Sequence, residues 1–303
     1  MPYYNTQAIV LTSTNYGEAD RILTLLTYER GRVRVIARGA RRPRNRFTAM
    51  AQPLNHIDVQ LAGSGNLETL NQGQMINSYR SLKEDLNRLA CASYLLELFD
   101  KATEGASDVA EVYIMLLTAL ELLQYCEVHS LVCMATEMKL LAAIGFRPQL
   151  EYCIYCQEML DNKKPLHYNI AEGGFTCDHC ASPSQGIYCN TFSRHLLLDL
   201  QKVHLAKLDS LLGTIRSAIV ENEDFAFNNT GTISRSGEVS YLESLLREKT
   251  VPISEAQEGI MQADKVIRES LRVHLGDLPK SSEFMDRVVT SPANQLLGNQ
   301  TKI

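Results

Sequence analysis

Residues 31–46 read GRVRVIARGARRPRNR, and this stretch decides how the first part of the chain folds. Its first half alternates between an apolar set and a mainly basic set, which is the period of a strand with one buried and one solvent-facing side. The apolar set is Val33, Val35 and Ala37, and the residues between are Arg32, Arg34 and Ile36. The second half, from Gly39 to Arg46, contains Pro43 and further arginines, which predicts a flexible basic loop.

Four more short runs with strand character surround this one. They are Ala8–Thr12, Ile22–Thr27, His56–Ala62 and Asn66–Leu70, separated by turn-forming residues. Five short strands predict a small β-barrel at residues 1–80, and the OB-fold is the small barrel most used for single-stranded nucleic acid. Tyr16, Tyr28 and Phe47 are candidate platforms for base stacking, although aromatic residues in a small barrel more often belong to its core.

The net charge of −5 hides a strong asymmetry. Residues 1–80 contain ten Arg, no Lys and five acidic residues, a balance of +5, so the rest of the chain carries −10. Eight of these arginines lie between Arg30 and Arg46 with no acidic residue among them. A charge cluster is often just a solvated surface, but unpaired like charges favour an anionic partner, and the planar guanidinium suits phosphate. The predicted contacts to a nucleic-acid backbone are Arg32, Arg34, Arg38, Arg41, Arg42, Arg44 and Arg46.

Two CxxC pairs, Cys153–Cys156 and Cys177–Cys180, are separated by twenty residues. Each pair places two thiols on one tight turn, and two such turns can surround one Zn²⁺ tetrahedrally. The alternatives are a redox motif, which more naturally occurs once, and a disulfide, which needs an oxidising compartment. A four-cysteine site leaves no open position for water, so it predicts a structural zinc, with His179 as a remote substitute ligand.

The rest of the chain has helical periodicity. The predicted helices are Leu86–Ala102, Val109–Tyr125, Leu131–Ile144, Ser193–Leu212 and Gly259–Leu275, with a short one at Tyr241–Glu248. The expected divisions are a barrel at 1–80, helices at 81–150, a four-cysteine lobe at 151–190, helices at 191–285 and a disordered tail at 286–303. A polar stretch at about 222–256 predicts a mobile insertion in the second helical part.

Catalytic signatures are missing from the sequence: it contains no phosphate-binding loop, no HExxH and no GxSxG. We therefore expect a protein that is not an enzyme and uses no ATP. The first residues lack a basic segment followed by an apolar run, and no apolar stretch reaches membrane-spanning length. These features predict a cytoplasmic protein with no membrane partner. Cys91, Cys126 and Cys133 are expected in the core, and Cys189 is expected to be reduced.

Four blocks of the sequence resemble the bacterial RecO recombination-mediator family, in the family's order and over most of the chain. The first two are AIVLTSTNYGEADRILTLLTYERGRVRVIARGARRPRNR from Ala8 and NLETLNQGQMINSYRSLKEDLNRLACASYLLELFDKATEG from Asn66. The others are MKLLAAIGFRPQLEYCIYC from Met138 and RVHLGDLPKSSEFM from Arg272. The resemblance implies an α+β protein with an N-terminal OB-fold and a mainly helical domain carrying a zinc-ribbon-like insertion.

The resemblance also implies a function in DNA repair of the RecF-pathway type, at the bacterial nucleoid. Members bind single- and double-stranded DNA, anneal complementary strands, and work with RecR and single-stranded-DNA-binding protein (SSB) to load a recombinase. Some members lack the four cysteines, whereas this chain has all of them. The alternatives are a zinc-ribbon RNA-binding or transcription-associated module and a metal-dependent nuclease. The nuclease is disfavoured because a four-cysteine site is saturated and the sequence has no acidic cluster.

The resemblance further implies a partner surface for the C-terminal tail of SSB. An acidic tail that ends in an aromatic residue needs an apolar groove flanked by cations. The predicted helices 109–125 and 131–144 can form such walls, with Lys139 and Arg147 as candidate cations. The alternative is that these helices simply pack on each other.

Overall fold

The computed structural model describes residues 3–63, 65–103, 109–126, 128–161, 163–181, 186–205 and 251–289. They form two compact units, Met1–His129 with Asp277–Val289, and Ser130–Gly276 with Thr290–Ile303. The barrel and the first helices share one unit, and the division near residue 80 stays a prediction. The predicted helix at 241–248 lies outside the described residues, as do most of the predicted insertion and of the predicted tail.

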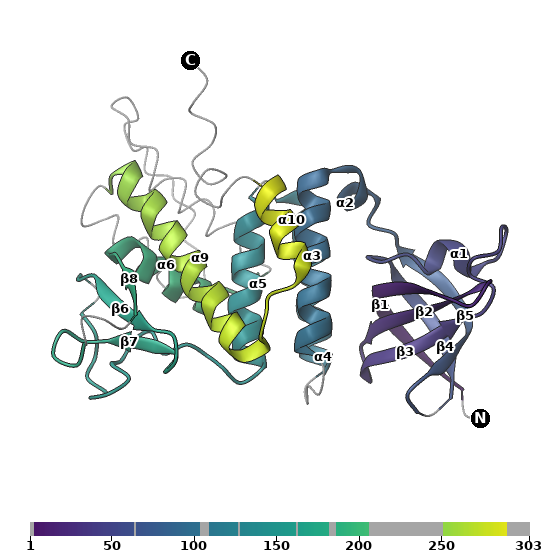
Figure 1. The fold of residues 1–303 in the computed structure, drawn as a ribbon, viewed down its shortest axis with the longest axis horizontal. Coiled ribbons are helices and arrows are strands. Elements are labelled where there is room, and N and C mark those ends of the chain that lie inside the picture. Colours follow the sequence, from purple (N-terminus) through teal and green to yellow (C-terminus); the bar gives the residue numbers. More distant parts are fainter. Residues whose placement is uncertain are drawn as a thin grey trace, which may run out of the picture. The chain divides into compact units, whose positions relative to one another are not determined.

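Five strands close into a barrel in the order β1-β2-β3-β5-β4 (Figure 1). They are β1 (Tyr3–Tyr16), β2 (Asp20–Thr27), β3 (Gly31–Ala37), β4 (His56–Ala62) and β5 (Glu68–Asn77). The β3–β5 pair is parallel and the other pairs are antiparallel, with α1 (Phe47–Met50) between β3 and β4. The predicted OB-fold is confirmed.

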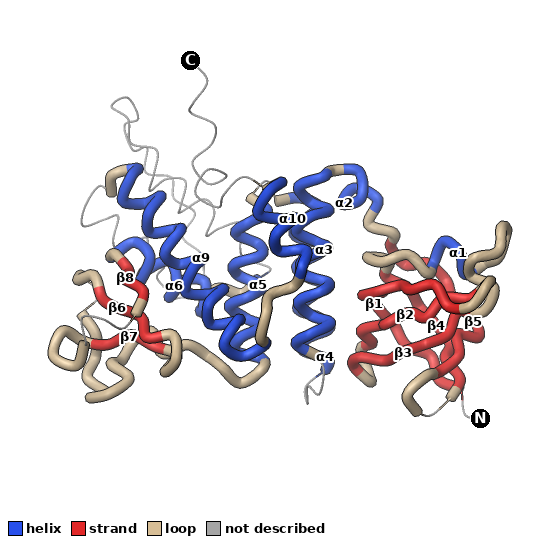
Figure 2. Tube along the Cα trace, viewed as in Figure 1, coloured by secondary structure: helices blue, strands red, loops and turns tan. Residues whose placement is uncertain are grey.

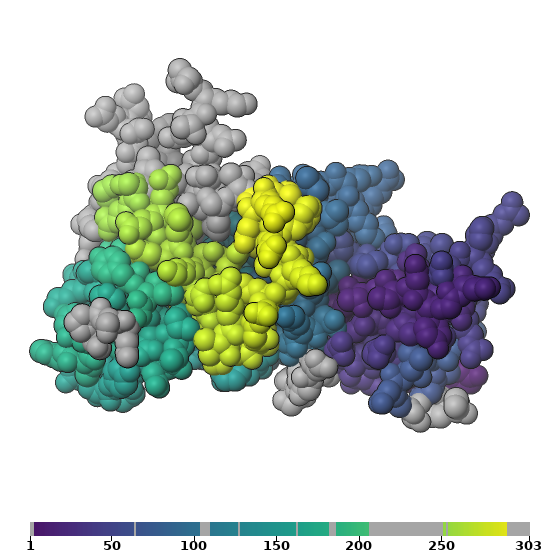
Figure 3. Space-filling model, in the orientation of Figure 1, coloured from purple at the N-terminus to yellow at the C-terminus, as the bar shows by residue number. Residues whose placement is uncertain are grey.

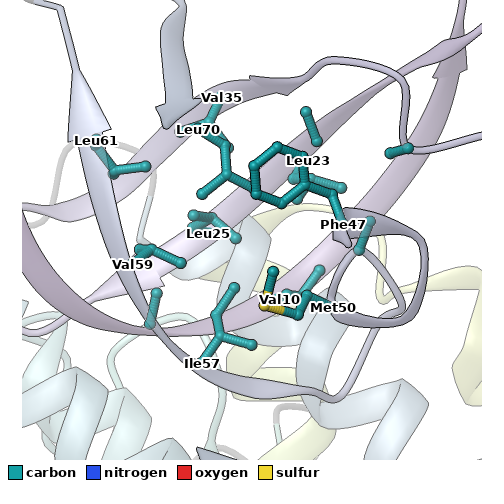
Figure 4. Close-up of a cluster of buried hydrophobic side chains, with 14 residues drawn as sticks. Val10, Leu23, Leu25, Val35, Phe47, Met50, Ile57, Val59, Leu61 and Leu70 are labelled. Atoms are coloured by element: carbon teal, nitrogen blue, oxygen red, sulfur yellow. The ribbon is translucent and has the colours of Figure 1, made fainter. Parts of the chain in front are cut away.

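The alternation in β3 sorts its side chains as predicted. Val35 and Ala37 are fully buried inside the barrel, Val33 packs against the same core, and Arg34 is exposed. Figure 4 shows Phe47 from α1 pointing into this core beside Leu23 and Leu70. Each fully buried large apolar side chain of this kind contributes roughly 1.5–3 kcal/mol. Phe47 is therefore a core residue and not a stacking platform.

Helices cover one part of the barrel's outer surface. The first unit contains α2 (Arg80–Glu84), α3 (Leu86–Ala102), α4 (Val109–Tyr125) and α10 (Lys280–Val288). Asp85 caps α3 by accepting a hydrogen bond from the Arg88 amide, and Ser281 of α10 donates to Glu97 of α3. Because α3 packs on β1 and α4 on β2 and β3, the outward-facing Ile9 and Leu26 are fully buried. In Figure 3 the purple barrel abuts the blue helical residues that follow it in the chain.

The second unit combines helices with a small sheet. Its elements are α5 (His129–Ala143), β6 (Leu166–Asn169), β7 (Gly174–Thr176), β8 (Ile187–Cys189), α6 (Thr191–Lys202) and α9 (Ile253–Leu275), with sheet order β7-β6-β8. Helix α9 begins at Ile253, inside the stretch predicted as an insertion. Arg194 of α6 is fully buried and donates to the carbonyls of Asp161 and Lys164, which fixes the loop before β6.

Candidate nucleic-acid interface and metal centre

The segment after β3, residues 38–46, is a compact series of turns, which we call the basic turns. Figure 2 shows it in tan on the α1 side of the barrel. The Gly39 amide donates to Asp20 Oδ1 at 2.7 Å, and the Arg41 amide donates to the Ala19 carbonyl at 2.8 Å. Asn45 accepts from the Phe47 amide, and its amide group lies where a Cβ on Gly39 would clash. The contacts of Gly39 and Arg41 join this segment to residues 19 and 20, which lie beside the turn between β1 and β2.

Six of the seven predicted arginines are exposed on or beside this end of the barrel. Arg34, Arg38, Arg42 and Arg44 form no ion pair within the described ranges of the chain. Arg41 donates to the Gly17 carbonyl and Arg46 to the Asn71 carbonyl, each at 2.6 Å, so both keep their positive charge. The guanidinium groups of Arg41 and Arg46 are therefore held by the scaffold without being neutralised.

Two arginines of the run are neutralised inside the first unit. Arg32 Nε lies 2.6 Å from Asp100 Oδ1 on α3, and both side chains are about three-quarters buried, at 26% and 24% exposed. Arg30 lies over the Tyr4 ring and 3.5 Å from Glu68 Oε1. Arg32 was predicted to contact the backbone, but it contacts the helix that covers the barrel. No local signal in the sequence connects it to Asp100.

Acidic groups near the basic turns are few. The Asp20 carboxylate accepts a hydrogen bond from the Gly39 amide, while Glu18 is exposed on the turn between β1 and β2. That turn contacts the basic turns through Ala19 and Gly17. The surface therefore keeps a positive excess, with one exposed carboxylate beside six cations.

The three candidate stacking residues have different environments. Phe47 is buried in the barrel core. Tyr28 is 44% exposed and packs edge-to-face on Tyr113 of α4, with ring centroids 5.7 Å apart. Tyr16, the last residue of β1, is 51% exposed and directly precedes Gly17, whose carbonyl binds Arg41. Only Tyr16 of the three has an open ring beside the basic turns.

The two CxxC turns meet in the second unit. The Sγ atoms of Cys153, Cys156, Cys177 and Cys180 all lie within 4.8 Å of one another. Cys156 Sγ and Cys177 Sγ are 3.6 Å apart, close to the edge of about 3.8 Å that a tetrahedron with Zn–S bonds of about 2.3 Å requires. The exposed His179 is not a member of this group. The cluster could hold one metal ion.

The electrostatics of the cluster also suit a cation. Burial alone would raise the pKa of Cys153, but the backbone amides of Cys156, Cys177 and Tyr155 outweigh it and lower the pKa to about 6. The pKa of Cys180 is raised to about 12, first by its hydrogen bond with Cys177 and then by burial. The Cys153 thiolate is thus preorganised, and a positive charge at the centre of the cluster would favour ionisation of the Cys180 thiol.

The remaining cysteines behave as core residues. Cys91, Cys126, Cys133 and Cys189 are buried, and all eight cysteines are free of disulfide bonds. The disulfide alternative for the CxxC pairs therefore does not apply to this structure. Within the described residues, no helix has both the length and the apolar character needed to span a membrane.

Comparison with known proteins agrees with this architecture. Residues 1–79 match the family model Recombination protein O N terminal, and residues 83–214 match Recombination protein O C terminal. DNA repair protein RecO of Symbiobacterium thermophilum is 36% identical over 220 residues, covering 70% of this chain and 87% of that protein. The Bacillus subtilis protein of the same name is 34% identical over 174 residues, 57% of this chain and 67% of that protein. With an OB-fold barrel, a helical part and a four-cysteine cluster, the chain belongs to the RecO family of DNA repair and recombination mediators.

Proposed function

We propose that this chain binds single- and double-stranded DNA through the exposed arginines of β3 and the basic turns, and anneals complementary strands without ATP. The observation that carries the proposal is a set of six exposed arginines that form no ion pair with any described residue, two of which are held by backbone carbonyls. They are Arg34, Arg38, Arg41, Arg42, Arg44 and Arg46.

Annealing requires little more than this surface. Two complementary strands repel each other through their phosphates, and base pairing supplies the free energy once that repulsion is screened. Arginines on a closed barrel can bind phosphates bidentately while leaving base edges accessible. The contacts are to the backbone, so we expect little base specificity.

The metal in the four-cysteine cluster is proposed to be a structural Zn²⁺. A closed Cys₄ site supports a fold and offers no position for a reacting water. The ion would join Cys153 and Cys156 to Cys177 and Cys180. Strands β6 and β7 lie in the sequence between these two pairs, so the ion would close the segment that contains them.

We also propose partners that the family membership suggests. The first partner is RecR. The second is SSB, and its displacement from single strands would let a recombinase load. We propose that these events take place in the cytoplasm, at the nucleoid. For the acidic SSB tail we retain Arg147, which is exposed, as a candidate contact in the second unit. Lys139 is a weaker candidate because its Nζ donates to the Gln201 carbonyl. Calorimetry with a synthetic tail peptide should show weaker binding to Arg147→Gln than to the unchanged protein.

The central experiment is a strand-annealing assay without nucleotide or Mg²⁺. The unchanged protein should accelerate annealing, and the triple variant Arg41→Ala, Arg42→Ala, Arg44→Ala should lose most of that acceleration. Arg80→Ala is the control, because Arg80 is an exposed arginine of the same unit that is paired with Glu84. Equal loss in the control would refute the assignment, and equal competition by RNA would favour the RNA-binding alternative.

A further inference from the structure

The four cysteines of the cluster differ in their exposure to solvent. Cys156 is exposed, Cys177 and Cys180 are partly exposed, and Cys153 is buried. Oxidation of a cysteine requires that the oxidant reach its sulfur atom. Cys156 is therefore the cysteine of this cluster that a dissolved peroxide reaches most readily.

The exposed sulfur atom lies against the other CxxC pair. Cys156 Sγ is 3.6 Å from Cys177 Sγ, so the two atoms are in contact. Cys153, the second member of the first pair, is held differently, because its buried sulfur accepts a hydrogen bond from the Cys177 amide at 3.4 Å. Exposure and contact together single out Cys156 and Cys177 as two sulfur atoms that can react with each other across the pairs.

We propose that a peroxide converts the cluster into a form with a disulfide bond between Cys156 and Cys177. The Cys156 thiolate attacks one peroxide oxygen, the O–O bond breaks, hydroxide leaves, and a sulfenic acid forms. The Cys177 thiolate then attacks the Cys156 sulfur, the S–O bond breaks, and a second hydroxide leaves as the S–S bond forms. The two thiolates lose two electrons, which reduce the peroxide, and two protons from solvent convert the hydroxides into water.

The disulfide changes what joins the two CxxC pairs. The inference rests on the proposed structural zinc, since a bound Zn²⁺ keeps its cysteine ligands deprotonated. With two of its four ligands oxidised, the cluster no longer holds the ion. The new bond still closes residues 157–176, which include β6 and β7, whereas a disulfide within each pair would leave them open. Exchange with a thiol reverses the bond and restores the cluster.

The sequence allows a direct readout of this bond. Trypsin cleaves after Lys163, between the two pairs, and it cleaves poorly before proline, so it spares the bonds after Arg147 and Lys164. Digestion therefore gives the peptides 140–163 and 164–194, each with one CxxC pair. A bond across the pairs joins these two peptides, and a bond within a pair leaves them separate.

The test treats the purified full-length protein with one equivalent of hydrogen peroxide, blocks the remaining thiols, and digests without reductant. Mass spectrometry should find the two peptides as one linked species, with fragment ions that place the bond at Cys156 and Cys177. A chromogenic zinc chelator should detect one zinc released for each link formed. Separate peptides that each contain an internal disulfide would refute the inference.

Two variants of the cluster form a matched pair. Cys156→Ser and Cys180→Ser each remove one metal ligand, but only Cys180→Ser keeps both cysteines of the proposed bond. The linked species should form in Cys180→Ser and be lost in Cys156→Ser. Linked peptides in Cys156→Ser would assign the reaction to Cys153 and overturn the inference. Hydrogen exchange of the barrel shows that each variant is folded.

The disulfide and the proposed zinc can fail separately. If the untreated protein contains zinc and peroxide produces no link, the disulfide is refuted and the metal site stands. If the untreated protein contains no zinc, the structural metal is refuted, and the peptide map still decides whether the link forms. A final comparison uses the oxidised protein and reduced protein stripped by a chelator. Residues 166–176 should exchange hydrogen about tenfold more slowly, or slower still, in the oxidised protein, because the bond closes their segment. Equal exchange would refute the disulfide as a replacement for the ion.

Discussion

Arg32 and Arg34 lie two positions apart on β3, and exchanging each for Gln should separate packing from DNA binding. Arg34 is exposed and Arg32 is paired with Asp100. Each phosphate neutralised on a single strand adds about −0.7 to the slope of log K against log salt. If the six exposed arginines each contact one phosphate, the slope is about −4, which is a loss of roughly 300-fold in affinity between about 50 and 200 mM salt.

Arg34→Gln removes one of these contacts. The slope should become shallower by about 0.7, so that the same rise in salt costs roughly 130-fold in affinity. Arg32→Gln should leave the slope unchanged, since its guanidinium is already neutralised. It should instead lower the free energy of unfolding by about 1 kcal/mol, because the ion pair is only partly buried and Asp100 loses its partner.

Anisotropy titrations at several salt concentrations give the slope, and urea unfolding gives the stability. Asp100→Asn is a second control, because it should destabilise the unit as Arg32→Gln does without removing any of the exposed arginines. The reasoning is refuted if Arg32→Gln flattens the slope as much as Arg34→Gln, since both arginines would then contact phosphate. An unchanged slope in Arg34→Gln would exclude this strand from the interface.

Three further predictions test the scaffold. Purified protein should contain one zinc per chain, and the Cys177→Ser variant should lose the metal. In that variant hydrogen exchange should increase in residues 166–189, while the barrel stays protected. A metal-free protein with reduced cysteines would contradict this prediction. Phe47→Ala should lower the free energy of unfolding by about 3–5 kcal/mol, measured in urea, because it empties part of the barrel core. Burial lowers the pKa of His56, which hydrogen-bonds the Tyr113 hydroxyl, below its ordinary 6.5. The folded protein favours the neutral form of His56, so the free energy of unfolding should fall as the pH drops below about 6.5. The fall should be smaller in His56→Gln. An equal fall in both proteins would refute this prediction.

Local periodicity was enough to predict most elements. The predicted bounds of α3 and α4 agree with the structure residue for residue. The strand β4 was also predicted at its observed bounds, whereas β1 extends to Tyr3 and Tyr16. These extensions are polar and partly exposed, so they lack the apolar alternation that marks a half-buried strand.

Contacts between distant residues could not be predicted in this way. Whether Phe47 enters the core or faces solvent depends on how α1 closes the barrel. Likewise, the difference between Arg32 and Arg34 depends on Asp100 of α3, which pairs with Arg32. The run of arginines predicted a charged surface correctly, but its division into a packing part and an open part is a tertiary property.

The charge of the four-cysteine lobe, residues 151–190, explains why DNA binding should be concentrated on the barrel. The lobe contains five acidic residues and two lysines, a balance of −3. They are Glu151, Glu158, Asp161, Glu172 and Asp178 against Lys163 and Lys164. Four thiolates around one Zn²⁺ would add −2, so the folded lobe repels phosphate at close range. Even if the arginine variants still bound DNA, the four-cysteine lobe would be a poor second candidate for the DNA-binding surface. A zinc-depleted protein should therefore retain the salt-dependent DNA affinity of the intact protein.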